Sequence, residues 1–142
     1  MSDDPAIRPI AVVAVVVQDG RLLVIRRSQN VRAPGALCFP GGAMEPGESE
    51  EETLLREMQE EVGLAVRPVR LLHVSTTPWH VEIRWWLAAA DELKFVLHPG
   101  EVESIHWHTP AELLAMQGVL ESNLAFLGAW QQESFEIDGL QR

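Results

Sequence analysis

Residues 42–64 read GAMEPGESEEETLLREMQEEVGL and contain eight of the 21 acidic residues of the chain. Glycine adopts the positive φ angles that other residues resist, and three glycines lie at or near the start of this stretch: Gly41, Gly42 and Gly47. A turn-rich loop is therefore predicted there. Ser49 precedes Glu52 at the spacing of a capping box, and Gly63 stands where a helix would end in a left-handed C-cap. The stretch is predicted to be a loop followed by a helix.

The two faces of this predicted helix differ in character. Helical spacing predicts a buried stripe of four apolar residues: Leu54, Leu55, Met58 and Val62. Glu57, Glu60 and Glu61 fall at positions i, i+3 and i+4, so a helix projects all three carboxylates from one face. A bound cation would remove the repulsion between them. Because the cluster offers oxygen ligands without nitrogen or sulfur, it suits Mg²⁺ or Mn²⁺ rather than zinc.

The same stretch resembles the signature of the Nudix hydrolases, G-x5-E-x7-R-E-U-x-E-E-x-G-U, in which U is a bulky aliphatic residue. Every fixed position is filled without insertion, by Gly42, Glu48, Arg56, Glu57, Met58, Glu60, Glu61, Gly63 and Leu64. The resemblance implies the α/β class and, within it, the Nudix-type α/β/α sandwich with a mixed central sheet. It also implies a metal-dependent hydrolase that cleaves the diphosphate linkage of a nucleoside diphosphate joined to another group, such as a nucleoside triphosphate, a nucleotide sugar, ADP-ribose or a dinucleoside polyphosphate.

The resemblance also assigns roles to the signature residues. Glu57, Glu60 and Glu61 would bind Mg²⁺ or Mn²⁺, and Glu48 would orient or supplement the metal shell. Arg56 resembles the family's arginine, which pairs with a signature carboxylate. A cation in such a site neutralises the diphosphate oxygens and lowers the pKa of a bound water, which then attacks phosphorus.

The signature leaves open which carboxylate accepts the proton of this water. Glu60 and Glu61 are candidates within it. Another candidate lies in the stretch GEVESIHW, which resembles the family's glutamate-bearing loop ahead of a strand tryptophan. We favour Glu101 over Glu103 because Glu101 lies six residues before Trp107, which is the usual offset.

Contacts to the substrate are predicted outside the signature. Arg26, Arg27 and Arg32 precede it, and a guanidinium group suits bidentate contacts to phosphate. A surface salt bridge is the alternative for each arginine. Trp79 follows Pro78 in a predicted loop and is the candidate for stacking on a nucleobase, with core packing as the alternative.

Two other functions stay open. The residues between Arg27 and the signature partly resemble the motif of coenzyme A diphosphatases, although one residue is missing between Arg32 and Gly35. A non-catalytic nucleotide sensor is the second alternative, although no signature acid is missing here. The sequence does not select the nucleotide.

The composition fits a globular protein: of 142 residues, 46% are hydrophobic and 23% charged. Residues 1–142 are predicted to form one domain. The net charge of −10 disfavours binding to extended nucleic acid or to an anionic membrane, and no apolar run reaches the roughly 18 residues of a membrane span. The start MSDDPAIRP is acidic and lacks the basic start of a signal peptide, and Cys38 is the only cysteine. These features predict a cytoplasmic protein, and its hydrophobic strand and tryptophan surfaces are compatible with a homodimer.

Periodicity and turn residues predict the remaining elements. Strands are expected over residues 10–17, 21–27, 37–39, 65–77, 80–90 and 104–108, and helices over 112–116 and 120–132. Asp19-Gly20 predicts a hairpin between the first two strands. Strands with interspersed helices place the chain in a mixed α/β class.

Overall fold

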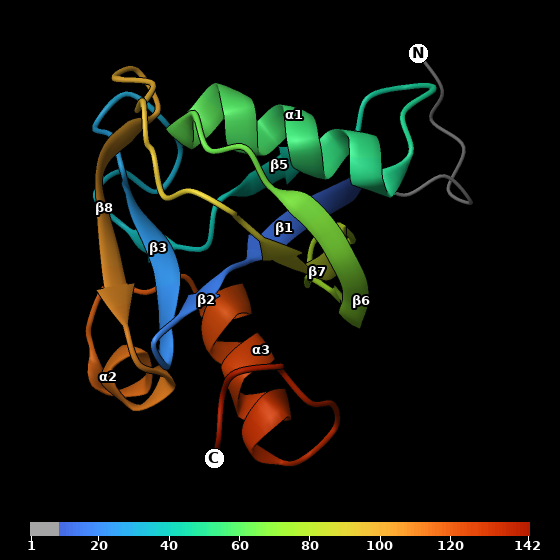
Figure 1. Cartoon of the computed structure of the whole chain (residues 1–142), viewed down its shortest axis with the longest axis vertical. Helices are drawn as coiled ribbons and strands as arrows, with labels where there is room; N and C mark the ends of the chain where they lie inside the picture. Colours follow the sequence, from blue (N-terminus) through green and yellow to red (C-terminus); the bar gives the residue numbers. More distant parts are fainter. Residues whose placement is uncertain (1–8) are drawn as a thin grey trace.

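The computed structural model describes residues 9–142 (Figure 1). Its strands are β1 (Ile10–Val15), β2 (Val17–Gln18), β3 (Arg21–Arg27), β4 (Leu37–Cys38), β5 (Gly41–Ala43), β6 (Arg67–Thr76), β7 (Glu82–Ala89) and β8 (Val102–His108). Its helices are α1 (Glu50–Val62), α2 (Pro110–Ala115) and α3 (Glu121–Gln131). The predicted elements are thus present, with shifted ends. One additional strand, β5, lies in the stretch that we predicted to be a loop.

The strands form two sheets that share one segment of chain. In the first sheet the order is β5-β1-β7-β6, with β1 and β7 parallel and the other pairs antiparallel. In the second sheet β3 pairs antiparallel with β2, β4 and β8. The predicted strand 10–17 is therefore divided at Val16, and its two parts belong to different sheets. Its continuous apolar character follows from the buried positions of β1 and Val16 and from Val17, which packs against the core while partly buried.

The Asp19-Gly20 hairpin is confirmed, although it joins β2 and β3. Asp19 has φ 52° and Gly20 has φ 74°, as a two-residue turn with positive φ at both central positions requires. This turn fixes the register that pairs Val17 with Leu22. Along β3, Leu22 and Val24 then share one face, and Leu23 and Ile25 share the other.

Helices cover both faces of the strand layer, as Figure 1 shows for α1 and α3. On one face Leu54, Met58 and Val62 of α1 pack with residues that include Leu23 and Ile25. On the other face α3 packs against a second cluster, in which the Trp85 and Phe126 rings stack with centroids 4.3 Å apart. The predicted α/β/α sandwich with a mixed sheet is therefore confirmed.

One member of the predicted apolar stripe on α1 was wrong. Leu55 is 43% exposed, whereas the other three members are buried. Leu54 and Leu55 are neighbours on the helix and point about 100° apart, so they cannot both face the sheet centre. Buried positions on α1 also include Thr53 and Glu61, which a purely apolar pattern misses.

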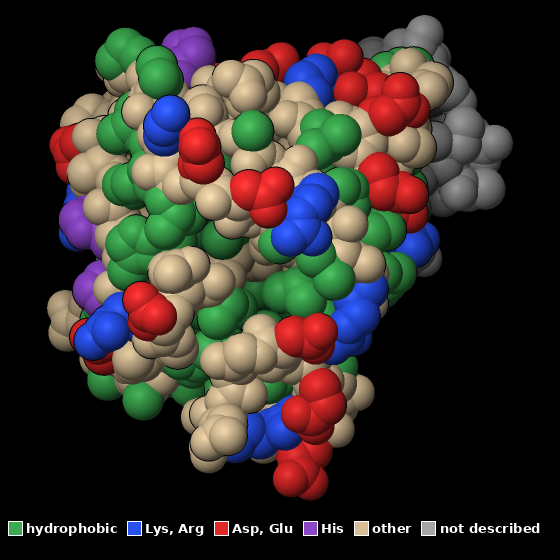
Figure 2. All heavy atoms as spheres, in the orientation of Figure 1, with side chains coloured by type: hydrophobic (Ala, Val, Ile, Leu, Met, Phe, Trp, Pro, Cys, Tyr) green, Lys and Arg blue, Asp and Glu red, His purple; other side chains and the backbone are tan. Residues whose placement is uncertain are grey.

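Acidic side chains are unevenly distributed on the surface. Figure 2 shows that, on the face drawn, one group lies over α1 and the loop that precedes it, and another lies at the lower right, near the segment that follows α3. Part of the net charge of −10 is therefore local to this helix. Within residues 9–142, no helix combines the length and apolarity that a membrane crossing requires. Residues 1–8, which include most of the acidic start behind the signal-peptide prediction, lie outside the described part.

Candidate active site

A polar pocket of about 290 Å³ lies where α1, β3, β5 and the loop before β8 meet. Its lining residues are Ile25, Arg27, Val31, Gly41, Gly42, Glu57, Glu61 and Glu101. Three carboxylates from two distant parts of the chain thus share one pocket with one guanidinium. This pocket is the candidate active site.

Glu61 is the most buried of the three carboxylates, at 6% exposed. It occupies the inner face of α1, where its Oε1 accepts a hydrogen bond of 3.1 Å from the Gly41 N–H. Burial raises the pKa of Glu61 to about 8, opposed by that hydrogen bond and assisted by the nearby charges of Glu57 and Glu101. A buried carboxylate among others is a group that a cation would stabilise in its ionised form.

Gly41 and Gly42 form the side of the pocket that faces α1. All three glycines at the start of the signature stretch are able to adopt positive φ, but only Gly47 does so, at 83°. Gly41 and Gly42 instead lie in β5, and space explains their identity. A Cβ on Gly41 would lie 2.7 Å from the Cα of Val13, and a Cβ on Gly42 would lie 2.5 and 2.6 Å from the Glu57 carboxylate oxygens.

Arg27 and Glu101 reach the pocket from the second sheet. Arg27 ends β3, and its Nε donates a hydrogen bond of 2.6 Å to the carbonyl oxygen of Arg32. Glu101 immediately precedes β8, which pairs with β3. Burial is also the main cause that raises the pKa of Glu57, and the charges of Glu60 and Glu101 add to it. Charged side chains from both sheets therefore lie in one pocket and interact electrostatically.

Arg56 organises the acidic residues beside the pocket. Its Nε and Nη2 donate to the two carboxylate oxygens of Glu48 at 2.7 and 2.9 Å, and its Nη1 donates to Glu57 at 2.9 Å and to Glu60 at 3.2 Å. Hydrogen bonds from Arg56 are the largest cause that lowers the pKa of Glu48 to about 2. The pKa of Arg56 is raised in turn, chiefly by Glu48. Arg56 thus pairs with signature carboxylates, as the resemblance implies.

The other predicted site residues lie outside the pocket lining. Glu60 is 53% exposed on its side chain and pairs with Arg56. Arg26 does not line the pocket; it donates to the Gly35 carbonyl and pairs with Glu103 at 3.7 Å. Arg32 is exposed and contributes its carbonyl to Arg27. Their direct roles in metal or substrate binding stay predictions.

Trp79 lies in a different pocket, at the turn between β6 and β7. This pocket measures about 320 Å³ and includes Pro78 and residues of the first turns of α3. Trp79 is 62% exposed there, unlike the buried Trp85 and Trp130. An accessible indole suits stacking, but no lining residue is common to this pocket and the carboxylate pocket.

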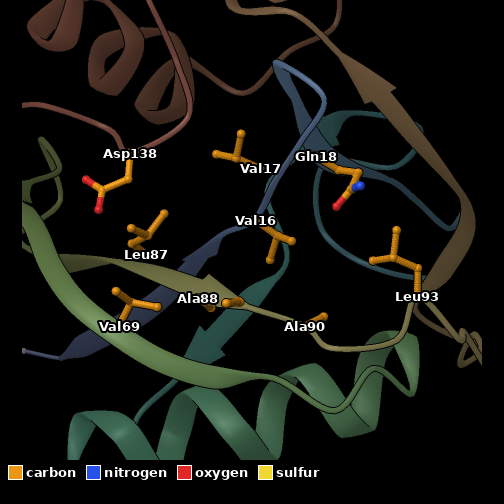
Figure 3. A pocket seen from close by; sticks show the side chains of 10 residues that line it. Val16, Val17, Gln18, Val69, Leu87, Ala88, Ala90, Leu93 and Asp138 are labelled. Atoms are coloured by element: carbon orange, nitrogen blue, oxygen red, sulfur yellow. The ribbon is translucent and has the colours of Figure 1, made fainter.

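A further pocket, of about 260 Å³, opens where the two sheets separate (Figure 3). Val16 and Val17 face it from one side, and Val69, Leu87 and Ala88 face it from the other. Its one carboxylate, Asp138, pairs with Arg70 at 2.6 Å. Because the lining of this pocket contains no cluster of unpaired charged side chains, the pocket is a weaker candidate for phosphate chemistry.

The residues present fit a divalent cation. Within residues 9–142, no three His, Cys, Asp or Glu side chains are grouped as a ready-made ion site. However, Glu57, Glu61 and Glu101 offer only oxygen donors, and the charge of Glu101 helps to raise the pKa values of Glu57 and Glu61. Oxygen donors with excess negative charge suit a hard divalent cation.

Comparison with known proteins connects this geometry to a family. The NUDIX domain model matches residues 7–127. The chain belongs to the Nudix family. Among solved structures with the Nudix fold, a MutT protein from Methanosarcina mazei Go1 superimposes with a TM-score of 0.74 at 23% identity, covering 90% of this chain and 96% of that one.

Nudix relatives with named activities share about a third of their aligned residues with this chain. The CTP pyrophosphohydrolase of Escherichia coli is 29% identical over 72% of this chain and 77% of that protein. The 8-oxo-dGTP diphosphatase of E. coli is 32% identical over 55% of this chain and 63% of that protein. The NAD-capped RNA hydrolase NUDT12 of Pongo abelii is 29% identical over 78% of this chain. The chain spans only 24% of the length of that relative.

Proposed function

We propose that this Nudix protein hydrolyses the diphosphate linkage of a nucleoside diphosphate joined to another group, with a divalent cation. The observation that carries the proposal is the pocket that combines Glu57, Glu61 and Glu101 with Arg27. Carboxylates bind the cation, and a guanidinium binds the phosphate that the cation does not neutralise. The relatives named above act on CTP, 8-oxo-dGTP and NAD-capped RNA, all of which contain such a linkage.

Glu57 and Glu61 are the proposed metal ligands. Both project from α1 into the pocket, and both carry pKa values raised by burial and neighbouring charge. The bound cation would neutralise diphosphate oxygens and acidify the attacking water. Glu48 is proposed to act through Arg56, because both of its oxygens already accept hydrogen bonds from that residue.

Glu101 is the proposed general base. Glu60 is paired with Arg56, and Glu61 is buried against the Gly41 N–H, which leaves Glu101 as the accessible carboxylate of the pocket. It accepts a proton from water as the water oxygen bonds to phosphorus. The bond between that phosphorus and the bridging oxygen breaks, and the electron pair leaves on the bridging oxygen. Arg27 holds the phosphate during this step.

A substrate panel tests the proposal. Purified protein is incubated with Mg²⁺ or Mn²⁺ and nucleoside triphosphates, 8-oxo-dGTP, ADP-ribose, NAD, dinucleoside polyphosphates or coenzyme A. We expect a nucleoside monophosphate and a second phosphate product from at least one of them. Tight binding without product over hours would instead favour the sensor alternative.

Glu61→Gln is the matching variant, and we expect it to lower kcat by at least about a hundredfold because a ligand is lost. Glu51→Gln is the matched control, since Glu51 is an exposed residue of α1 outside the pocket and the capping box. Equal rates in both variants would contradict the assignment of the site.

A further inference from the structure

The Glu101 carboxylate lines the pocket without a partner among the side chains of residues 9–142. Among the described residues, no hydrogen bond or ion pair to this carboxylate is found, although Glu101 lines the pocket. Its position therefore depends on the main chain of Gly100 and Glu101. The contacts of that main chain are specific and come from two directions.

The first set of contacts joins the Glu101 loop to α1. The His98 N–H donates to the Glu61 carbonyl at 2.9 Å, and the His98 carbonyl accepts from the N–H groups of Glu101 and Val102 at 3.0 and 2.8 Å. The Val96 N–H donates to the Val62 carbonyl at 2.8 Å. These donors satisfy carbonyls at the C-terminal end of α1, where no intrahelical partner exists.

Gly63 allows this approach. It has φ 65° in the left-handed C-cap, and a Cβ at this position would lie 2.7 Å from the Val96 nitrogen. The segment that leads to Glu101 thus lies directly on the end of the helix that carries Glu57 and Glu61.

The second set of contacts comes from Ser28, the residue after Arg27. The Ser28 N–H donates to the Glu101 carbonyl at 2.9 Å, and the Ser28 hydroxyl donates to the Gly100 carbonyl at 2.7 Å. Ser28 is buried and does not line the pocket. One residue therefore joins the strand that carries Arg27 to the loop that carries Glu101.

We infer that Ser28 is a positioning residue, whose hydroxyl fixes the Gly100-Glu101 main chain so that the Glu101 carboxylate faces Glu57, Glu61 and Arg27. The inference rests on the proposed function for its kinetic consequence. It adds a residue that lies outside the Nudix signature and touches no substrate. The hydrogen bonds of the His98 main chain, which connect this loop to α1, hold the same main chain as well.

A double-mutant cycle separates positioning from general stabilisation. Ser28→Ala should lower kcat about fivefold, the scale of one hydrogen bond, with KM unchanged. Glu101→Gln alone should lower kcat about a hundredfold. In the Glu101→Gln background, Ser28→Ala should have no further effect. Multiplication of the two single effects would overturn the inference, and so would an unchanged kcat in Ser28→Ala.

Ser104→Ala is the matched control. Ser104 lies on β8, and its hydroxyl contacts His106 at 2.8 Å rather than the Glu101 loop. We expect this variant to keep the wild-type kcat. Should Ser28→Ala fail to fold, Ser28→Cys supplies the cycle, because a thiol is a weaker donor of similar shape.

Amide hydrogen exchange provides a readout that needs no substrate. Exchange at residues 98–102 should accelerate in Ser28→Ala and stay unchanged in Ser104→Ala. Unchanged exchange in Ser28→Ala would overturn the inference. If no compound of the panel is hydrolysed, the proposed function fails, whereas the exchange measurement still decides whether Ser28 holds this loop.

Discussion

At the scale of single residues, the shape of the pocket depends on glycine, which has no side chain, as well as on charged side chains. Gly42 leaves room for the Glu57 carboxylate, whose carbon would lie only 2.4 Å from a Cβ at this position. Arg56 then holds Glu57 from the other side through Nη1. The position of the Glu57 carboxylate therefore depends on the space left by Gly42, which has no Cβ, and on the ion pair with Arg56.

Gly42→Ala should displace the Glu57 carboxylate and lower kcat/KM at least about tenfold, the effect of a small misplacement at a reaction centre. The fold should survive, because Gly42 lies in β5 without a positive φ. Gly128→Ala is the control. A Cβ at Gly128, in α3, meets no atom within 4 Å, so its stability should rise by up to about 1 kcal/mol with kcat/KM unchanged. Steady-state kinetics measure kcat/KM, and urea unfolding measures the stability of the two variants. Full activity in Gly42→Ala would contradict the steric explanation.

At the scale of elements, α1 is delimited by contacts that its own sequence encodes. The Ser49 side chain accepts a hydrogen bond from the Glu52 N–H, and the Glu52 carboxylate accepts one from the Ser49 N–H, both at 3.0 Å. Gly63 ends the helix in the left-handed conformation. Both ends were predicted correctly because they depend on residues within three positions of each helix end.

Ser49→Ala should lower the free energy of unfolding by about 1 kcal/mol and Tm by about 3 to 5 °C, because a helix N–H loses its partner. The kcat/KM measured well below Tm should not change, since Ser49 lies outside the pocket. Ser134→Ala, an exposed serine beyond α3, should leave Tm unchanged. A loss of Tm in both variants would point to a cause other than the cap.

Elements that depend on distant partners were harder to predict. β5 consists of Gly41, Gly42 and Ala43, which have little intrinsic strand preference, and it exists because β1 pairs with it. The division at Val16 was missed because burial in two different sheets gives the same apolar run as burial in one. Arg26 and Arg27 were both predicted to contact phosphate, because only the packing of α1 and β8 decides which of them lines the pocket.

At the scale of the whole molecule, the acidic α1 region already contains a cation of its own. Arg56 pairs with Glu48, Glu57 and Glu60, so part of the local charge is balanced within the chain. We therefore expect the protein to unfold cooperatively even in the presence of a chelator. Metal binding would then stabilise an already folded chain rather than drive its folding.

Addition of Mg²⁺ to the chelated protein should raise Tm. At a concentration of about 100 times Kd the gain is about 2.7 kcal/mol, which corresponds to roughly 5 to 10 °C for a chain of this size. Thermal unfolding at constant ionic strength measures the shift, and Glu61→Gln should lose most of it. An equal shift in Glu61→Gln would place the cation elsewhere.

The residues of the candidate site that lie on one helix could be predicted from the sequence. Those that meet only because the chain folds were harder to predict. Glu57 and Glu61 were identified from spacing alone. Ser28 and the main chain of His98 carry no sequence signal, because their contacts are with main-chain atoms of residues far along the chain. Whether Trp79 binds a nucleobase stays a prediction that a substrate panel with Trp79 variants addresses.

The division of one chain segment between two sheets has a consequence for the chemistry. Glu57, Glu61 and the glycines of β5 belong to the body built on the first sheet, whereas Arg27 and Glu101 belong to the second. Val16, which is buried, is the residue at which β1 passes into β2. The separation between the proposed base, Glu101, and the proposed metal ligands, Glu57 and Glu61, therefore depends on how the two sheets are oriented. A substitution at Val16 is therefore expected to change the geometry of the pocket, although Val16 does not line it.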